Sequence, residues 1–193
     1  GNSLNSVYFV NENIGWAVGN DGSILTTTNG GSNWFTQTSG VTQHLKSVYF
    51  LDDNYGWAVG DEGTIIKTID GGLNWTSHSI IAYYITSVYF INPNIGWIVT
   101  GRNIYKTTNG GITWLLEYTS SNYALYAINF MDNSNGWVIG NFGHIYKTAN
   151  GGNDWLQVSS GTRKIGNEIF FINENTGWVS FIDFGEYDHE LLK

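Results

Sequence analysis

The stretch SVYFVNENIGWAVG, residues 6–19, returns as SVYFLDDNYGWAVG at residues 47–60 and decides the fold of this chain. Related stretches begin at Ser87, Ala127 and Glu168 and complete a series of five. Each contains a Gly-Trp pair, and the tryptophans follow at intervals of 41, 40, 40 and 41 residues: Trp16, Trp57, Trp97, Trp137 and Trp178. A fixed period of this length indicates one supersecondary unit that repeats and buries its apolar face against the next.

The second copy, residues 45–79, shows the internal pattern of this unit most clearly. Four short runs rich in aromatic and β-branched residues, separated by turn clusters, predict strands A to D at residues 47–51, 56–59, 64–68 and 74–77. Glycines interrupt every window of about ten residues, which excludes a helix of ordinary length. In strand A, Val48 and Phe50 should lie on one face and Tyr49 on the other.

Four antiparallel strands in about 40 residues are typical of one blade of a β-propeller. The sequence therefore predicts an all-β protein, a β-propeller of four-stranded antiparallel blades with four full blades and a partial fifth. A single partial propeller would occupy residues 1–193, with blades at about 4–40, 45–80, 85–120, 125–160 and, incomplete, 166–193.

The last residues match the beginning of an earlier strand C. Leu191-Leu192-Lys193 corresponds to the first three positions of Ile145-Tyr146-Lys147-Thr148. We therefore expect the chain to be part of a longer propeller of about six to eight blades. The alternative is a five-bladed ring that a strand from the N-terminus or from another chain completes.

Composition narrows the class of protein. The chain has 193 residues, of which 41% are hydrophobic and 16% aromatic, enough for a continuous core. Its net charge of −8 would repel phosphate backbones, which argues against nucleic acid as a partner. No apolar run approaches the ~20 residues of a membrane-spanning helix. Because there is no cysteine, structural disulfides and thiolate metal sites are excluded.

A second tryptophan closes an octet in each of the first four copies, at residues 27–34, 68–75, 107–114 and 148–155. The octets share a threonine at the first position, Asn or Asp at the third, glycines at the fourth and fifth, and the tryptophan: Asn29 and Trp34, Asp70 and Trp75, Asn109 and Trp114, Asn150 and Trp155. They resemble the Asp-box (BNR-type) hairpin, Ser/Thr-x-Asp-x-Gly-x-Thr-Trp. Together with the Gly-Trp-Ala-Val-Gly strand, the pattern resembles the propeller family of the photosystem II stability/assembly factor, which also includes many secreted bacterial proteins. The resemblance covers residues 4–193 and implies the same fold.

The octets are expected to be structural. The Asn or Asp oxygen can accept hydrogen bonds from amides of its own turn, and the tryptophan is placed to wedge between blades. Three of the four copies carry an amide where calcium would require several carboxylates. We therefore predict a hairpin clasp rather than a catalytic or metal site.

Binding residues are expected at the opposite end of the blades. The turns between strands A and B share one end with the octets, whereas the B–C turns and D–A connections meet at the other end and differ most between copies. Their side chains could form an aromatic platform with polar contacts for a glycan or a protein, or the aromatics could fold inward and cover the blades. The candidates are His44, Tyr83, Tyr84, Arg102, Tyr123, Tyr126, Phe142 and Arg163.

The sequence contains no recognisable catalytic motif. Sialidases, which also carry Asp-boxes, hold their substrate with three arginines, but this chain has only Arg102 and Arg163. The four histidines lack metal-ligand spacing, and no nucleophile elbow is present. Acidic side chains in the last copy, Asp183, Glu186, Asp188 and Glu190, could ligate a cation, although a solvated loop is the preferred interpretation. No catalytic residue, metal or cofactor is assigned.

The sequence thus favours a non-enzymatic extracellular or cell-surface propeller, the periplasm being a further location, that presents loops for protein or glycan binding. One alternative is part of an Asp-box glycoside hydrolase of the sialidase or xyloglucanase type. The other is a photosystem-type assembly factor. In the family that this chain resembles, basic residues are associated with partner binding. This chain is acidic, so the assembly role is harder to transfer to it.

Overall fold

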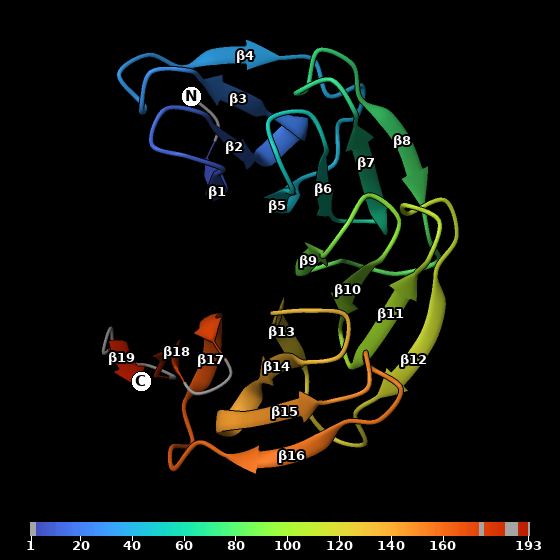
Figure 1. The fold of residues 1–193 in the computed structure, drawn as a ribbon, viewed down its shortest axis with the longest axis vertical. Helices are drawn as coiled ribbons and strands as arrows, with labels where there is room; N and C mark the ends of the chain where they lie inside the picture. Colours follow the sequence, from blue (N-terminus) through green and yellow to red (C-terminus); the bar gives the residue numbers. More distant parts are fainter. Residues whose placement is uncertain (1–2, 174–175, 184–188, 193) are drawn as a thin grey trace. The chain divides into compact units, whose positions relative to one another are not determined.

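The computed structural model describes residues 3–173, 176–183 and 189–192, and within them the secondary structure is almost entirely β (Figure 1). Four sheets have four strands and one has three, each in sequential order. The fold is therefore a β-propeller of antiparallel blades, as the sequence predicts.

The first two sheets contain strands β1 to β8. The first comprises β1 (Leu4–Phe9), β2 (Gly15–Gly19), β3 (Ile24–Thr27) and β4 (Phe35–Gln37), with the 3-10 turn η1 (Asn20–Gly22) between β2 and β3. The second comprises β5 (Leu45–Phe50), β6 (Gly56–Gly60), β7 (Thr64–Thr68) and β8 (Thr76–Ser79).

The remaining sheets contain strands β9 to β19. The third comprises β9 (Ser87–Phe90), β10 (Gly96–Thr100), β11 (Asn103–Thr107) and β12 (Leu115–Thr119). The fourth comprises β13 (Leu125–Phe130), β14 (Gly136–Gly140), β15 (His144–Thr148) and β16 (Leu156–Ser159), with η2 (Asn141–Gly143) between β14 and β15. The fifth comprises β17 (Ile165–Asn173), β18 (Thr176–Ile182) and β19 (His189–Leu192).

Backbone contacts divide the chain into two compact units, one of residues 1–96 and 107–114 and one of residues 97–106 and 115–193. In the first unit, the ring of Trp16 stacks on Phe50 with centroids 3.5 Å apart, and Trp57 stacks on Phe90 at 3.6 Å. In the second unit, Trp97 stacks in the same way on Phe130 at 3.6 Å. Each Gly-Trp strand thus covers the strand-A phenylalanine of the following sheet.

The octet tryptophan contributes a different contact. Trp75 meets the edge of Phe50, in its own sheet, at 5.9 Å and 88°. Trp155 contacts Phe130 at 5.9 Å in the same manner. The parallel stacking between consecutive sheets is therefore made by the Gly-Trp residue, and the octet residue Trp155 also contacts Tyr118 of β12, in the preceding sheet, at 6.5 Å.

The glycine of each Gly-Trp pair has a steric reason. A Cβ atom on Gly56 would lie 2.4 Å from ring atoms of Phe50, and one on Gly136 would lie 2.5 Å from Phe130. No real Cβ contact is that short, so the phenylalanine ring requires glycine beneath it. This explains why strand A and the Gly-Trp pair recur together.

Two details differ from the sequence-based predictions. Strand β8 begins at Thr76 rather than Asn74, because the N–H of Asn74 is still held in the turn by Oδ1 of Asp70 at 2.9 Å. Tyr126 lies within β13 and not in the preceding connection. Tyr49 is buried, like Val48 and Phe50 on the other face of β5, because its ring packs between those of Tyr8 and Tyr89, the equivalent positions of β1 and β9.

Backbone hydrogen bonds agree with the expected placement of the turns. At one end, the N–H of Gly71 in the second octet donates to the carbonyl of Asn54 in the A–B turn at 3.0 Å. At the other end, the N–H of Glu62 in the B–C turn donates to the carbonyl of Tyr83 in the D–A connection at 2.8 Å. The B–C turns and D–A connections therefore support one another directly. Among the residues that the structure describes, no helix has the length and apolarity needed to cross a membrane.

Candidate binding site

The oxygens of the octets are used within their own turns. In the second octet, Oγ1 of Thr68 donates to Oδ1 of Asp70 at 2.8 Å and accepts from the N–H of Gly72 at 2.8 Å. Oδ1 of Asp70 also accepts from the N–H of Asn74, and hydrogen bonds from Asn74 are the main cause of the lowered pKa of Asp70. Asn29, Asn109 and Asn150 each hold the equivalent pair of bonds.

The tryptophans that close the octets are partly or fully covered. Trp155 is buried, whereas Trp34, Trp75 and Trp114 are half-buried. Within the described part of the chain, no group of three or more His, Asp or Glu side chains could hold a metal ion. Of the acidic residues in the last copy, Glu186 and Asp188 lie outside the described residues.

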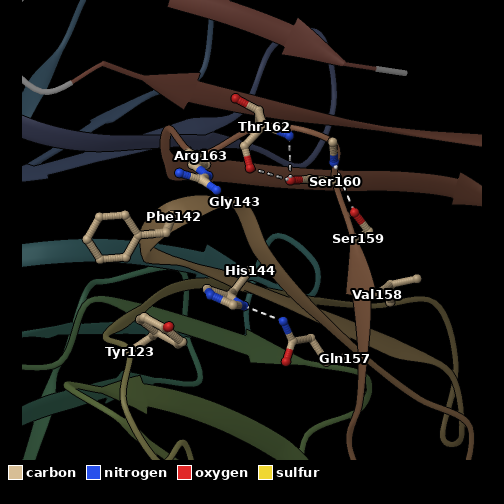
Figure 2. Close-up of a pocket in the computed structure, with 11 residues that line it drawn as sticks. Tyr123, Phe142, Gly143, His144, Gln157, Val158, Ser159, Ser160, Thr162 and Arg163 are labelled. Atoms are coloured by element: carbon tan, nitrogen blue, oxygen red, sulfur yellow. Dashed lines mark hydrogen bonds between the residues drawn. The ribbon is translucent and has the colours of Figure 1, made fainter.

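An open groove of about 930 Å³ lies at the opposite end of the fourth sheet (Figure 2). Its walls come from four segments: the connection before β13, the turn η2 with the start of β15, strand β16, and the connection after β16. Each segment contributes one or two of the side chains Tyr123, Phe142, His144, Gln157 and Arg163.

Three rings form the floor of this groove. Tyr123 stacks on the imidazole of His144 with centroids 3.9 Å apart and an interplanar angle of 20°. Phe142 meets Tyr123 edge-on at 5.7 Å and 71°. Phe142 is nevertheless 50% exposed, so its free face is available to a ligand.

The backbone of Phe142 is left-handed, with φ +56°. The tight turn imposes this conformation, because the equivalent residues Asp21 and Glu62 have φ +55° and +57°. The N–H groups on either side are fixed to neighbouring connections: Asn141 donates to the carbonyl of Ala124 at 2.9 Å, and Gly143 to that of Lys164 at 2.6 Å. A bulky residue in this region is strained and uncommon. The turn therefore fixes the backbone of Phe142, and its exposed ring lines the groove.

Partial burial lowers the pKa of the His144 imidazole below its ordinary value, and the side-chain amide of Gln157 forms a hydrogen bond with its Nδ1. Arg163 is exposed at the opposite wall of the groove, beside Phe142 and Gly143 (Figure 2). The groove therefore combines an apolar stacking floor, hydroxyl and amide groups, and one cation.

Three of the eight residues proposed from the sequence, namely Tyr123, Phe142 and Arg163, meet in this groove. The others are placed elsewhere. Nδ1 of His44 accepts from the N–H of Asp21 at 3.0 Å, and Nη1 of Arg102 donates to the carbonyl of Ser121 at 3.0 Å.

The remaining three tyrosines also lie outside the groove. The side chain of Tyr83 is 90% exposed, and Tyr84 forms a β-bridge with Asp61. Tyr126 belongs to β13.

The sequence analysis missed His144 and Gln157 as members of the site. One signal was available for His144, since it opens strand C at a position where the second and third copies carry Thr64 and Asn103. Gln157 gave no signal of its own, because its role depends on the pairing of β15 with β16, which brings it beside His144.

Comparisons with known proteins bear on the family and the fold. A family model described as the photosynthesis system II assembly factor YCF48 matches residues 2–77 and 81–176. No curated protein sequence matches the chain.

Among solved structures, YCF48 from Cyanidioschyzon merolae is similar with a TM-score of 0.72 and 22% identity, over 94% of this chain and 64% of that one. YCF48 bound to D1 peptide has a TM-score of 0.56 and 14% identity, over 92% and 90% of the two chains. The GH74 enzyme of Niastella koreensis has a TM-score of 0.74 and 20% identity, over 92% of this chain and 33% of that enzyme. Identities this low show a common fold. The chain spans less than two thirds of the first of these relatives.

Proposed function

The chain belongs to the family of the photosystem II assembly factor YCF48, and we propose that it is a non-enzymatic propeller that binds a segment of a partner protein. One structure similar to this chain is YCF48 bound to D1 peptide, which supports a peptide as the class of ligand. The observation that carries the proposal is the exposed, left-handed Phe142 beside the stacked rings of Tyr123 and His144.

The chemistry of the groove supports binding. Rigid aromatic side chains supply a large contact area and lose little conformational entropy when they are covered. The volume of about 930 Å³ lies at the upper end of the range for small-molecule pockets, which is suitable for several residues of a peptide. The lining side chains are aromatic rings, hydroxyls, amides, an imidazole and a guanidinium. Glycoside hydrolysis would instead need two carboxyl groups about 5–10 Å apart.

The identity of the partner and the location of the protein are part of the proposal. A glycan is the second class of ligand that an aromatic floor would accept. The proposed location is extracellular or at the cell surface, and the composition of the repeats, which are rich in Asn, Thr and Ile, supports it. The similarity to the GH74 enzyme concerns the fold alone, so it does not favour hydrolysis.

A parallel screen tests this function. Immobilised protein is exposed to a random dodecapeptide library displayed on phage and to a glycan array, with the double variant Tyr123→Ser/Phe142→Gly as the matched control. We expect the wild type to enrich peptides and the variant to lose at least about tenfold in affinity for them. Enrichment of glycans alone, or release of sugars from an oligosaccharide substrate, would sink the proposal.

A further inference from the structure

Strand β16 is the outer strand of the fourth sheet, whose order is β13-β14-β15-β16. Within the described residues, no strand of this sheet lies beyond it, so half of its backbone N–H and C=O groups face outward. All four of its residues, Leu156, Gln157, Val158 and Ser159, are exposed. Proteins usually protect such an edge with a charged residue or proline, and this strand has neither.

Two hollows follow the same strand. The groove described above, of about 930 Å³, includes Gln157, Val158 and Ser159 in its wall. A second hollow, of about 910 Å³, includes Leu156, Gln157 and Val158. Because Gln157 and Val158 line both, the two hollows border the same strand, the first reaching Ser159 and the second Leu156.

The two faces of β16 differ in chemistry. Register places Ser159 opposite His144 and Val158 opposite Ile145, and successive side chains of a strand alternate between faces. Gln157 and Ser159 therefore share a face with His144, on the side of the aromatic floor. Leu156 and Val158 share the other, aliphatic face, and are 75% and 44% exposed. A strand added to this edge would meet an aromatic and polar row on one side and an aliphatic row on the other.

The two hollows beside β16 contain cationic side chains, although the chain as a whole is acidic. Arg163 lies in the first hollow, whereas Lys147 and Asp154 lie in the second. The carboxylate of Asp154 accepts from Nδ2 of Asn150 at 2.8 Å, and Nζ of Lys147 lies 5.2 Å from the ring centre of Trp137. Arg163 is thus an exposed cation in a chain of net charge −8, so a carboxylate on the ligand is favoured there.

We propose that an extended segment of a partner protein adds to the edge of β16 as a further strand. The segment carries apolar side chains at alternate positions, which pack on Leu156 and Val158, and a carboxylate that pairs with Arg163. Backbone hydrogen bonds to β16 supply affinity, and the two rows of side chains supply specificity. This inference rests on the proposed function and states how the peptide is held.

The experiment uses the peptides selected from the phage library, synthesised and titrated against the full chain. In one series the peptide is N-methylated at its odd positions, and in a second series at its even positions. Only alternate N–H groups of an antiparallel strand point to its neighbour. Methylation in one series should therefore weaken binding at least about tenfold, and methylation in the other should change it little.

Variants of the protein test the place of binding. Val158→Lys adds a charge to the exposed edge and should weaken binding about tenfold, because such charges prevent strand pairing. Leu115→Lys, at a 67% exposed position of the outer strand β12, is the matched control and should have no effect. Arg163→Gln should weaken binding about threefold and reduce its dependence on salt.

Hydrogen exchange separates the possible results. Binding should protect the amides of residues 156–160 from hydrogen exchange. This protection, together with a loss of affinity in only one of the two N-methylation series, supports the inference. Strand addition is overturned if N-methylation lowers the affinity equally in both series, or if the peptides protect amides outside residues 156–160. Either result leaves the proposal of peptide binding intact. A library that yields no binding peptide overturns the proposed function itself.

Discussion

Phe142 combines a backbone φ of +56°, which its tight turn imposes, with a side chain that is half exposed. Glycine adopts this conformation without strain, whereas other residues lose about 1–2 kcal/mol. We therefore expect Phe142→Gly to leave the free energy of unfolding unchanged within about 1 kcal/mol, because relief of strain offsets the lost contact with Tyr123. Peptide binding should fall at least about tenfold in the same variant. Chemical denaturation and a binding titration measure the two effects.

The neighbouring Gly143 provides the contrast. It also has a positive φ, +70°, and a Cβ atom there would lie 2.2 Å from the carbonyl oxygen of Thr162. Gly143→Ala should therefore destabilise the protein by more than about 1 kcal/mol. If Phe142→Gly destabilised as strongly as Gly143→Ala, Phe142 would be a structural residue.

At the scale of the element, the Gly-Trp strand holds the next sheet through both ring and indole N–H. Nε1 of Trp57 donates to the carbonyl of Gly110 at 3.2 Å, whereas Nε1 of Trp97, equally buried, has no hydrogen-bond partner. Nζ of Lys106 takes the corresponding carbonyl, that of Gly151, at 2.9 Å.

Trp57 and Trp97 provide a test in which one tryptophan is the control for the other. Trp57→Phe removes ring volume and a hydrogen bond, and Trp97→Phe removes ring volume only. We expect the loss in free energy of unfolding to be about 1 kcal/mol larger for Trp57→Phe. Equal losses, measured by urea denaturation, would show that the hydrogen bond contributes nothing.

The octet turn should respond to acid in one copy only. Hydrogen bonds, chiefly from the Asn74 side chain, lower the pKa of Asp70 in the folded protein. Because the pKa of Asp70 is lower in the folded than in the unfolded state, where it is about 3.9, the ionised carboxylate stabilises the fold at pH values above the unfolded-state pKa. That stabilisation is lost as the pH falls through the folded-state pKa. The difference in free energy of unfolding between wild type and Asp70→Asn should therefore shrink as pH falls from about 5 to about 2.

A reciprocal change checks the cause. Asn109→Asp places a carboxylate in the equivalent turn, where Nδ2 of Asn109 now donates to Oγ1 of Thr113. This variant should acquire the acid sensitivity that Asp70→Asn loses, because the threonine hydroxyl can turn to donate. Parallel pH profiles for all three proteins would contradict the assignment.

The elements were more predictable than the site because their signals are local. The 40-residue period and the Gly-Trp pairs predict the strands, and β7 occupies the predicted residues 64–68. The sequence predicts a place between sheets for the octet tryptophan but not for the Gly-Trp residue, because it does not show that Phe50 lies over Gly56 and beneath Trp16. The groove was less predictable, because it forms where the connections before β13 and after β16 meet the turn η2. These segments are distant in the sequence, so no local pattern shows that they meet.

At the scale of the whole molecule, the repeats show which apolar positions a neighbouring sheet covers. Leu45, Val48 and Phe50 of β5 are buried in the core of the first unit, next to Trp16. The equivalent residues of β1, Leu4, Val7 and Phe9, are 51%, 59% and 40% exposed. Within the described residues, the same sequence pattern is therefore covered by a Gly-Trp residue in β5 and largely exposed in β1.

This difference predicts unequal losses for one substitution made at two equivalent positions. Val48→Ala should cost about 1–2 kcal/mol, because Val48 is 4% exposed and the change leaves a cavity. Val7→Ala should cost less than about 0.5 kcal/mol, because water already contacts that side chain. Urea denaturation gives both values, and sedimentation at several concentrations checks that the protein stays monomeric. Similar losses at both positions would mean that another sheet covers β1 in solution, since only burial of Val7 makes its methyl groups as costly to remove as those of Val48.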